Sequence, residues 1–208
     1  MASREEHGFS LLEMVITLSI VLIMCGVSFM TMWPVIHQSN VNSAYDTTLM
    51  ALRNTRNLAI TQSHEYIVTF TPVAGAVPAT IQVQYQPPTV GGIAQPIQQV
   101  INYTIPPGAD FQMQAGFPAS KPDGFGTGIN AIDFESTPGV PLSPGYVVFY
   151  PDGSAQDNLG NYVTGVVYIT RPNDTIFNSR AITVWGATGR IRGWRLAQPA
   201  GVTSWVQQ

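Results

Sequence analysis

Residues 8–33 read GFSLLEMVITLSIVLIMCGVSFMTMW, and residues 14–36 contain no Asp, Glu, Lys or Arg. As a helix, residues 14–33 are long enough to cross the hydrocarbon core of a bilayer, which is about 30 Å thick. The short segment before this run is not positively charged, and no small-residue cleavage site follows it. A secretory signal peptide would carry both features. The sequence therefore predicts a membrane-spanning helix that is retained.

Glu13 stands at the edge of the apolar run. An unpaired carboxylate is costly there, so Glu13 is interpreted as a functional residue. It ends a short motif that resembles the leader junction of the type IV pilin and type II secretion pseudopilin superfamily, Gly8-Phe9-Ser10-Leu11-Leu12-Glu13. The resemblance implies that a prepilin peptidase cuts after Gly8 and that the new N-terminus, Phe9, is methylated. It also implies that Glu13 neutralises the N-terminal ammonium of a neighbouring subunit, because opposite charges in low dielectric are tolerated only as pairs.

The same resemblance divides the chain into three parts. These are a leader peptide of residues 1–8, a transmembrane and filament-assembly helix of residues 9–36, and a periplasmic or extracellular domain of residues 37–208. It implies a single-pass protein of the bacterial inner membrane, later incorporated into a pilus or pseudopilus. The implied partners are other pilins or pseudopilins, the prepilin peptidase and the membrane itself.

Beyond the apolar run the helical pattern becomes amphipathic. Apolar residues recur at helical spacing, with polar residues between them: Val41, Tyr45, Leu49, Leu52 and Ala59. This periodicity predicts one helix over residues 9–63 whose later part packs on a sheet. Pro34 leaves two interpretations open, a helix that ends there and a helix that bends there in a filament. Arg53 and Arg56 are expected on a solvated face or in hydrogen bonds to nearby carbonyl groups.

Strand patterns replace the helical one after residue 63. Runs rich in β-branched and aromatic residues predict strands at residues 66–71, 80–86, 97–105, 146–150, 163–170 and 181–185, with a short one at 131–134. Residues 106–144 are dense in Gly and Pro and predict long loops. The fold class expected is α+β, a long N-terminal helix packed on antiparallel β-sheet.

Three later segments narrow the resemblance to the minor pseudopilin group called GspH/FimT-like. They are the helical segment of residues 51–60, the Phe-Tyr-Pro-Asp-Gly turn of residues 149–153, and the strand of residues 182–190, which ends in Gly-Arg. One departure is Thr55-Arg56, which stands where that group commonly has an alanine-arginine pair. The implied function is a structural subunit of a type IV pilus tip or priming complex. The equivalent subunit of a type II secretion system remains an alternative.

Composition and motifs indicate no catalytic chemistry. Charged residues make up only 10% of the chain and the net charge is −3. The three histidines have no metal-ligand spacing, and the single cysteine, Cys25, lies inside the apolar run. Asp133 and Glu135 alternate along a predicted strand and are expected at the surface. We therefore expect no enzyme, no metal site and no cofactor.

Arginines are concentrated near the C-terminus of this acidic chain. Arg190, Arg192 and Trp194 share one face of a continuing strand, and Arg195 follows. Arginine beside an aromatic ring suits phosphate and base contacts, and the Gly-Arg-x-Arg pattern resembles a segment with which DNA-uptake members of the FimT-like group hold DNA. A DNA-binding minor pilin for natural transformation is thus a further alternative. The competing interpretation is that Gly-Arg closes the last strand and Trp194 belongs to the core.

Overall fold

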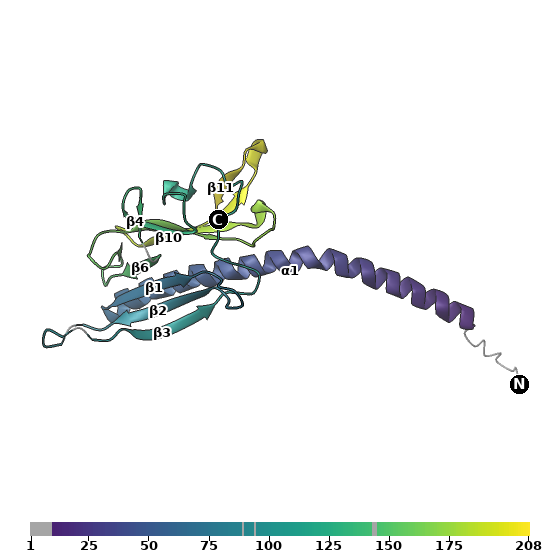
Figure 1. Cartoon of the computed structure of the whole chain (residues 1–208), viewed down its shortest axis with the longest axis horizontal. Coiled ribbons are helices and arrows are strands. Elements are labelled where there is room, and N and C mark those ends of the chain that lie inside the picture. The colour runs from purple at the N-terminus through teal and green to yellow at the C-terminus, as the bar shows by residue number, and fades with distance from the viewer. Residues whose placement is uncertain (1–9, 89, 94, 143–144) are drawn as a thin grey trace, which may run out of the picture. The chain divides into compact units, whose positions relative to one another are not determined.

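The computed structural model describes residues 10–88, 90–93, 95–142 and 145–208 (Figure 1). The chain divides into two compact units, residues 1–37 and residues 38–208. Helix α1 (Leu11–Gln62) is continuous across this division and matches the predicted helix closely. Pro34 lies inside α1, so the interpretation that the helix ends at this proline is wrong. Proline removes one backbone hydrogen bond and its ring crowds the carbonyl four residues earlier, at a cost of about 3 kcal/mol, which does not end a helix of 52 residues.

One face of α1 forms part of the core of the second unit. Its fully buried residues recur every three or four positions: Val41, Ala44, Thr48, Ala51, Leu52, Thr55 and Ala59. The two threonines in this stripe each donate a hydroxyl hydrogen bond to the carbonyl four residues earlier, so no donor is left unpaired there. The predicted amphipathic pattern is confirmed, with Leu49 half-buried against the same core.

The first sheet of the second unit is antiparallel and has the strand order β3-β2-β1-β6-β7. Strand β1 follows directly from the helix and pairs with β2 on one side and β6 on the other. Alternate residues of β1, namely Tyr66, Val68 and Phe70, are buried in the core. The bounds are β1 (Glu65–Thr71), β2 (Thr80–Gln86), β3 (Gln98–Thr104), β6 (Tyr146–Phe149) and β7 (Ala155–Gln156).

The second sheet is also antiparallel and has the order β11-β10-β9-β8-β4-β5. In Figure 1 the strands labelled β4 and β10 lie on the other side of the core part of α1 from β1, β2 and β3. At Gly193 the sheet and the helix approach closely, because a Cβ there would lie 1.6 Å from the Tyr45 hydroxyl oxygen. The bounds are β4 (Ile132–Thr137), β5 (Val140–Pro141), β8 (Thr164–Ile169), β9 (Arg180–Trp185), β10 (Arg190–Ala197) and β11 (Ser204–Gln207).

A covering loop between β3 and β4, residues 105–131, packs on the outer face of the second sheet. Its Met113 and Phe117 contact a small apolar cluster formed by Val166, Tyr168 and Ala181. Strand β8 is consequently buried on both faces. Three single 3-10 turns complete the described elements, at Pro122–Gly124, Ile176–Asn178 and Pro199–Gly201. The Gly- and Pro-rich segment was expected as loops, and it is irregular, but it covers the sheet rather than standing in solvent.

The predicted α+β fold, a long N-terminal helix packed on antiparallel sheets, is confirmed. All seven predicted strands are present within one to three residues of their expected ends. The interpretation that Gly189-Arg190 closes the last strand is wrong, because Arg190 begins β10 and β11 follows it. Residues 186–189 are instead the turn of the β9–β10 hairpin.

Candidate functional site

The first half of α1 exposes a large apolar surface. Among the side chains described between Leu11 and Ile36, seventeen large apolar ones are each at least 47% exposed. The hydroxyls of Thr17, Ser19 and Ser28 donate to carbonyl oxygens three or four residues earlier, at 2.7–3.0 Å. These polar groups are therefore satisfied within the helix itself, as a lipid environment requires. By length and composition the helix is a candidate membrane span.

Glu13 lies in the first turn of α1, and its backbone is held by the helix that begins around it. From Ser10 to Tyr45 it is the only Asp, Glu, Lys or Arg in the sequence. A carboxylate in a first helical turn interacts favourably with the helix dipole. That interaction explains why Glu13 does not disrupt the helix, but it is no substitute for a counter-charge in lipid. Gly8 and Phe9, the predicted cleavage and methylation residues, lie outside the described residues.

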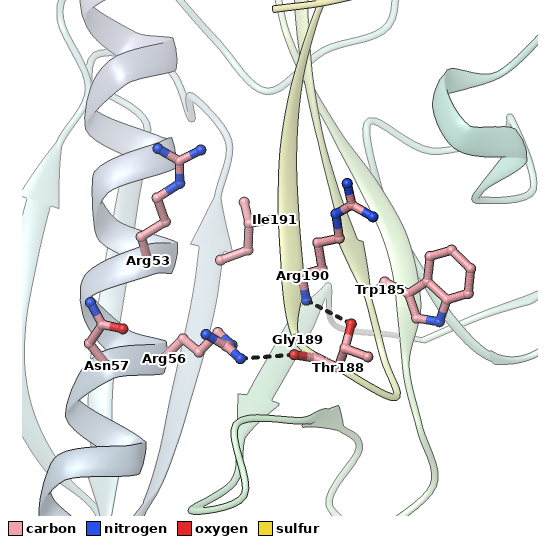
Figure 2. Close-up of a pocket in the computed structure, with 8 residues that line it drawn as sticks. All are labelled: Arg53, Arg56, Asn57, Trp185, Thr188, Gly189, Arg190 and Ile191. Carbon is pink, nitrogen blue, oxygen red and sulfur yellow. Dashed lines mark hydrogen bonds between the residues drawn. The ribbon is translucent and has the colours of Figure 1, made fainter.

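A second feature is an open arginine groove of about 670 Å³ at the tip of the β9–β10 hairpin (Figure 2). Arg53 borders it from α1, and Arg190 and the exposed Trp185 border it from the two strands of the hairpin, with their side chains on the side away from α1 (Figure 2). The residues that line the groove in the described part of the chain include no carboxylate: Arg53, Arg56, Asn57, Trp185, Thr188, Gly189, Arg190 and Ile191. The groove therefore has a positive charge that suits anions.

Arg56 ties three distant segments together at the floor of this groove. Its Nε donates to the Gly153 carbonyl and its Nη2 to the Thr188 carbonyl, both at 3.0 Å. The expected hydrogen bonds to carbonyl groups are thus confirmed for Arg56, while Arg53 is exposed. Because a charged donor strengthens such hydrogen bonds, Arg56 fixes the helix to both turns.

The turn that presents Gly153 is organised by Asp152. Its carboxylate accepts hydrogen bonds from the Ser154 hydroxyl at 2.6 Å and from the Ser154 backbone N–H at 2.8 Å. The hydroxyl first, and then the backbone N–H, lower the pKa of Asp152 below its ordinary value. Asp157 similarly accepts from Leu159 and Asn161 within its own loop. Both carboxylates therefore stabilise the turns in which they lie.

The structure separates the four residues that were suggested for DNA binding. Arg190 is exposed at the groove, but Arg192 forms a 2.6 Å salt bridge with Asp123 of the covering loop. Trp194 donates its indole N–H to the Thr183 hydroxyl at 3.0 Å and packs on the outer cluster. Arg195, one residue out of phase, lies on the opposite face of β10. The interpretation of Trp194 as a packing residue is the one that agrees with its contacts.

Sequence reasoning missed Asp133, whose expected surface position is wrong. The side chain is fully buried, and its carboxylate accepts from the Thr127 hydroxyl and from the Gly128 backbone N–H at 2.8 Å each. These donors come from the end of the covering loop, six and five residues before Asp133 in the sequence. Glu135 is half-buried and accepts from the Gly139 N–H. In the part of the chain that is described, no cluster of His, Cys, Asp or Glu is suited to a metal ion.

Comparisons with known proteins bear on the N-terminal segment. Residues 3–29 match the prokaryotic N-terminal methylation motif, which spans the predicted leader junction, Glu13 and much of the exposed apolar helix. Searches of curated proteins and of solved structures gave no significant match. The motif is typical of the type IV pilin and pseudopilin superfamily, whose members are structural proteins. With its apolar helix and its α+β domain, the chain is a membrane-anchored, type IV pilin-like protein that carries the N-terminal methylation motif and is structural, not enzymatic.

Proposed function

We propose that the chain is a minor pilin that primes or tips a type IV pilus. Prepilin peptidase cuts it after Gly8 and methylates Phe9, and residues 9–36 hold it in the inner membrane before assembly. Residues 37–208 then form a periplasmic domain that becomes part of the filament. The match at residues 3–29, joined to the exposed apolar helix of the same segment, is the observation that supports this proposal.

Support for a GspH/FimT-like minor subunit comes from the contacts of Arg56. The three segments that resemble this group are the helix around Arg56, the turn ending at Gly153, and residues 182–190, which run from β9 through the hairpin turn. Arg56 donates to the carbonyl of the second segment and to the carbonyl of Thr188 in the third. The side chain of Arg56 thus links three segments that are far apart in the sequence and that all resemble one group.

Deletion of the gene tests the assignment to a pilus. We expect surface pili, counted by electron microscopy, to fall at least tenfold and to return when the intact gene is supplied. A priming subunit acts before bulk assembly, so its loss affects every filament. Unchanged pili, together with loss of a secreted protein from the medium, would instead favour the type II secretion pseudopilus.

The arginine groove favours a second candidate function, DNA capture for transformation. Arg53, Arg190 and the exposed Trp185 ring combine positive charge with a stacking surface. A site of this size contacts only two or three phosphates, so binding would be weak and strongly dependent on salt.

A salt titration of DNA binding by the full-length protein in detergent micelles tests this candidate. We expect Arg190→Gln to lower the slope of log affinity against log salt by about one, because one phosphate contact is lost. Arg171→Gln, which removes one positive charge outside the groove, controls for net charge. No binding of fluorescent duplex DNA at low salt, or equal slopes for the two variants, would exclude DNA capture by this groove.

A further inference from the structure

Two arginines face each other across the β9–β10 pair. Arg180 and Arg195 are directly opposite in the register of the two strands, so their side chains leave the same face of the sheet. Like charges in this position repel each other and destabilise the sheet. Arg180 is only 6% exposed, so water screens its charge poorly. The pair has an energetic cost that other contacts must offset.

The contacts of Arg180 within the protein are with neutral groups. Its guanidinium donates to Asn42 Oδ1 at 2.8 Å, to the Ser179 carbonyl at 3.0 Å and to the Phe177 carbonyl at 3.4 Å. Burial first, and then the positive charge of Arg195, lower the pKa of Arg180, while Tyr45 and Asp46 act in the opposite direction. Among the described residues no carboxylate lies within salt-bridge distance of either arginine.

The pair lines an open pocket of about 380 Å³, within the size range of small-ligand sites. Gln38, Asn178 and Gln198 line the same pocket. The amide of Asn178 already donates to Asp174 Oδ2 and that of Gln198 to the Gly201 carbonyl, so each has one further N–H to offer. Arg195 also borders an adjacent hollow at the C-terminus, beside Gln207. A pocket with two guanidinium groups, neutral amides and no acid among its lining residues suits an anion with several oxygen atoms.

We propose that Arg180 and Arg195 bind the phosphate of an anionic phospholipid headgroup at the membrane surface. Gln38 lines the pocket and follows the last apolar residue of the exposed helix, Ile36, by two positions, or about 3 Å of helix rise. The pocket lining therefore includes a residue that follows the apolar segment almost directly in the sequence, and this favours a lipid as the source of the phosphate. This inference rests on the membrane anchoring described in the proposed function. The bound phosphate offsets the repulsion between Arg180 and Arg195 while the subunit is anchored in the bilayer before assembly.

Native mass spectrometry of the full-length protein in detergent micelles tests the site with two lipids, dioleoyl phosphatidylglycerol and dioleoyl phosphatidylcholine. We expect wild type to prefer the phosphatidylglycerol, and Arg195→Gln to lower that affinity about fivefold, the effect of one cation at a membrane surface. Arg195→Lys keeps most of the affinity. Arg195 is exposed, so the variant is expected to fold, and circular dichroism verifies this. Arg171→Gln, which removes one positive charge outside both this pocket and the arginine groove, is the control and leaves lipid binding unchanged.

Three results would overturn the proposal. These are equal affinity of wild type for the two lipids, an equal loss of affinity in the Arg171 and Arg195 variants, and preferential binding of a short DNA duplex that Arg195→Gln abolishes. Displacement of phosphatidylglycerol by millimolar inorganic phosphate supports a phosphate-binding pocket, whereas phosphate binding without any lipid preference contradicts the lipid as its source. The measurement uses purified protein, so failure of the filament proposal would not alter its outcome.

Discussion

Glu13→Ala is expected to leave the protein processed and inserted in the membrane, but more than tenfold depleted from filaments. The carboxylate is the single charged side chain of the sequence from Ser10 to Tyr45. In a filament of packed helices it would pair with the N-terminal ammonium of a neighbour. Loss of one partner from such a low-dielectric pair leaves the other charge uncompensated, at a cost of about 3–5 kcal/mol. A difference of about 1.4 kcal/mol already changes an equilibrium tenfold.

Immunoblots of sheared pili and of membranes measure this effect. Asp46→Ala is the matched control, because it removes an exposed carboxylate from the same helix beyond the apolar segment. Gly8→Ala is the processing control and should give an uncut precursor on a gel. Alanine favours helix, so loss of helix would not explain a defect. Normal incorporation of Glu13→Ala would show that the pairing is unnecessary.

Gly189→Ala is expected to destabilise the second unit by about 3 kcal/mol or more. Gly189 has a φ of +58° and is buried at the turn of the β9–β10 hairpin. An added Cβ would lie 1.9 Å from the Gly153 carbonyl oxygen and 2.8 Å from Arg56 Nε. Backbone strain of about 1–2 kcal/mol, overpacking of about 1–3 kcal/mol and weakened charged hydrogen bonds all act in the same direction.

Thermal unfolding of the full-length protein in detergent micelles, followed by the β-sheet circular dichroism signal, checks this result. A loss of this size corresponds to a fall in Tm of roughly 10 °C for a unit of this length. Gly75→Ala is the matched control, because Gly75 has a φ of +62° but no atom within 4 Å of an added Cβ. We expect it to cost less than about 1 kcal/mol, since strain is partly offset by a less flexible unfolded chain. Equal losses in the two variants would mean that the close approach to Gly153 contributes nothing.

The apolar segment, the long helix and most strands are local properties, and the sequence predicts them well. Hydrophobic periodicity identifies the buried face of α1 at Val41, Leu52 and Ala59 because side-chain direction follows the helical repeat. The methylation motif is also local, since a peptidase recognises a short junction beside an apolar run. The strands from Tyr66 to Phe70 and from Tyr146 to Phe149 are read from β-branched and aromatic residues in the same way.

Contacts between segments decided the rest. Asp133 looks like a surface residue in its strand, but it is buried, and Thr127 and Gly128, just before the strand in the covering loop, donate to its carboxylate. Arg192 and Trp194 lie on one face of β10, as their spacing predicts. Asp123 nevertheless forms a salt bridge with Arg192, and the Thr183 hydroxyl accepts a hydrogen bond from the indole N–H of Trp194. Residue spacing determines which face of a strand a side chain occupies, whereas the segments that cover that face depend on chain folding over long separations. The sequence by itself therefore determined the anchor, the helix and the α+β class, and only the tertiary structure decided which arginines reach a pocket.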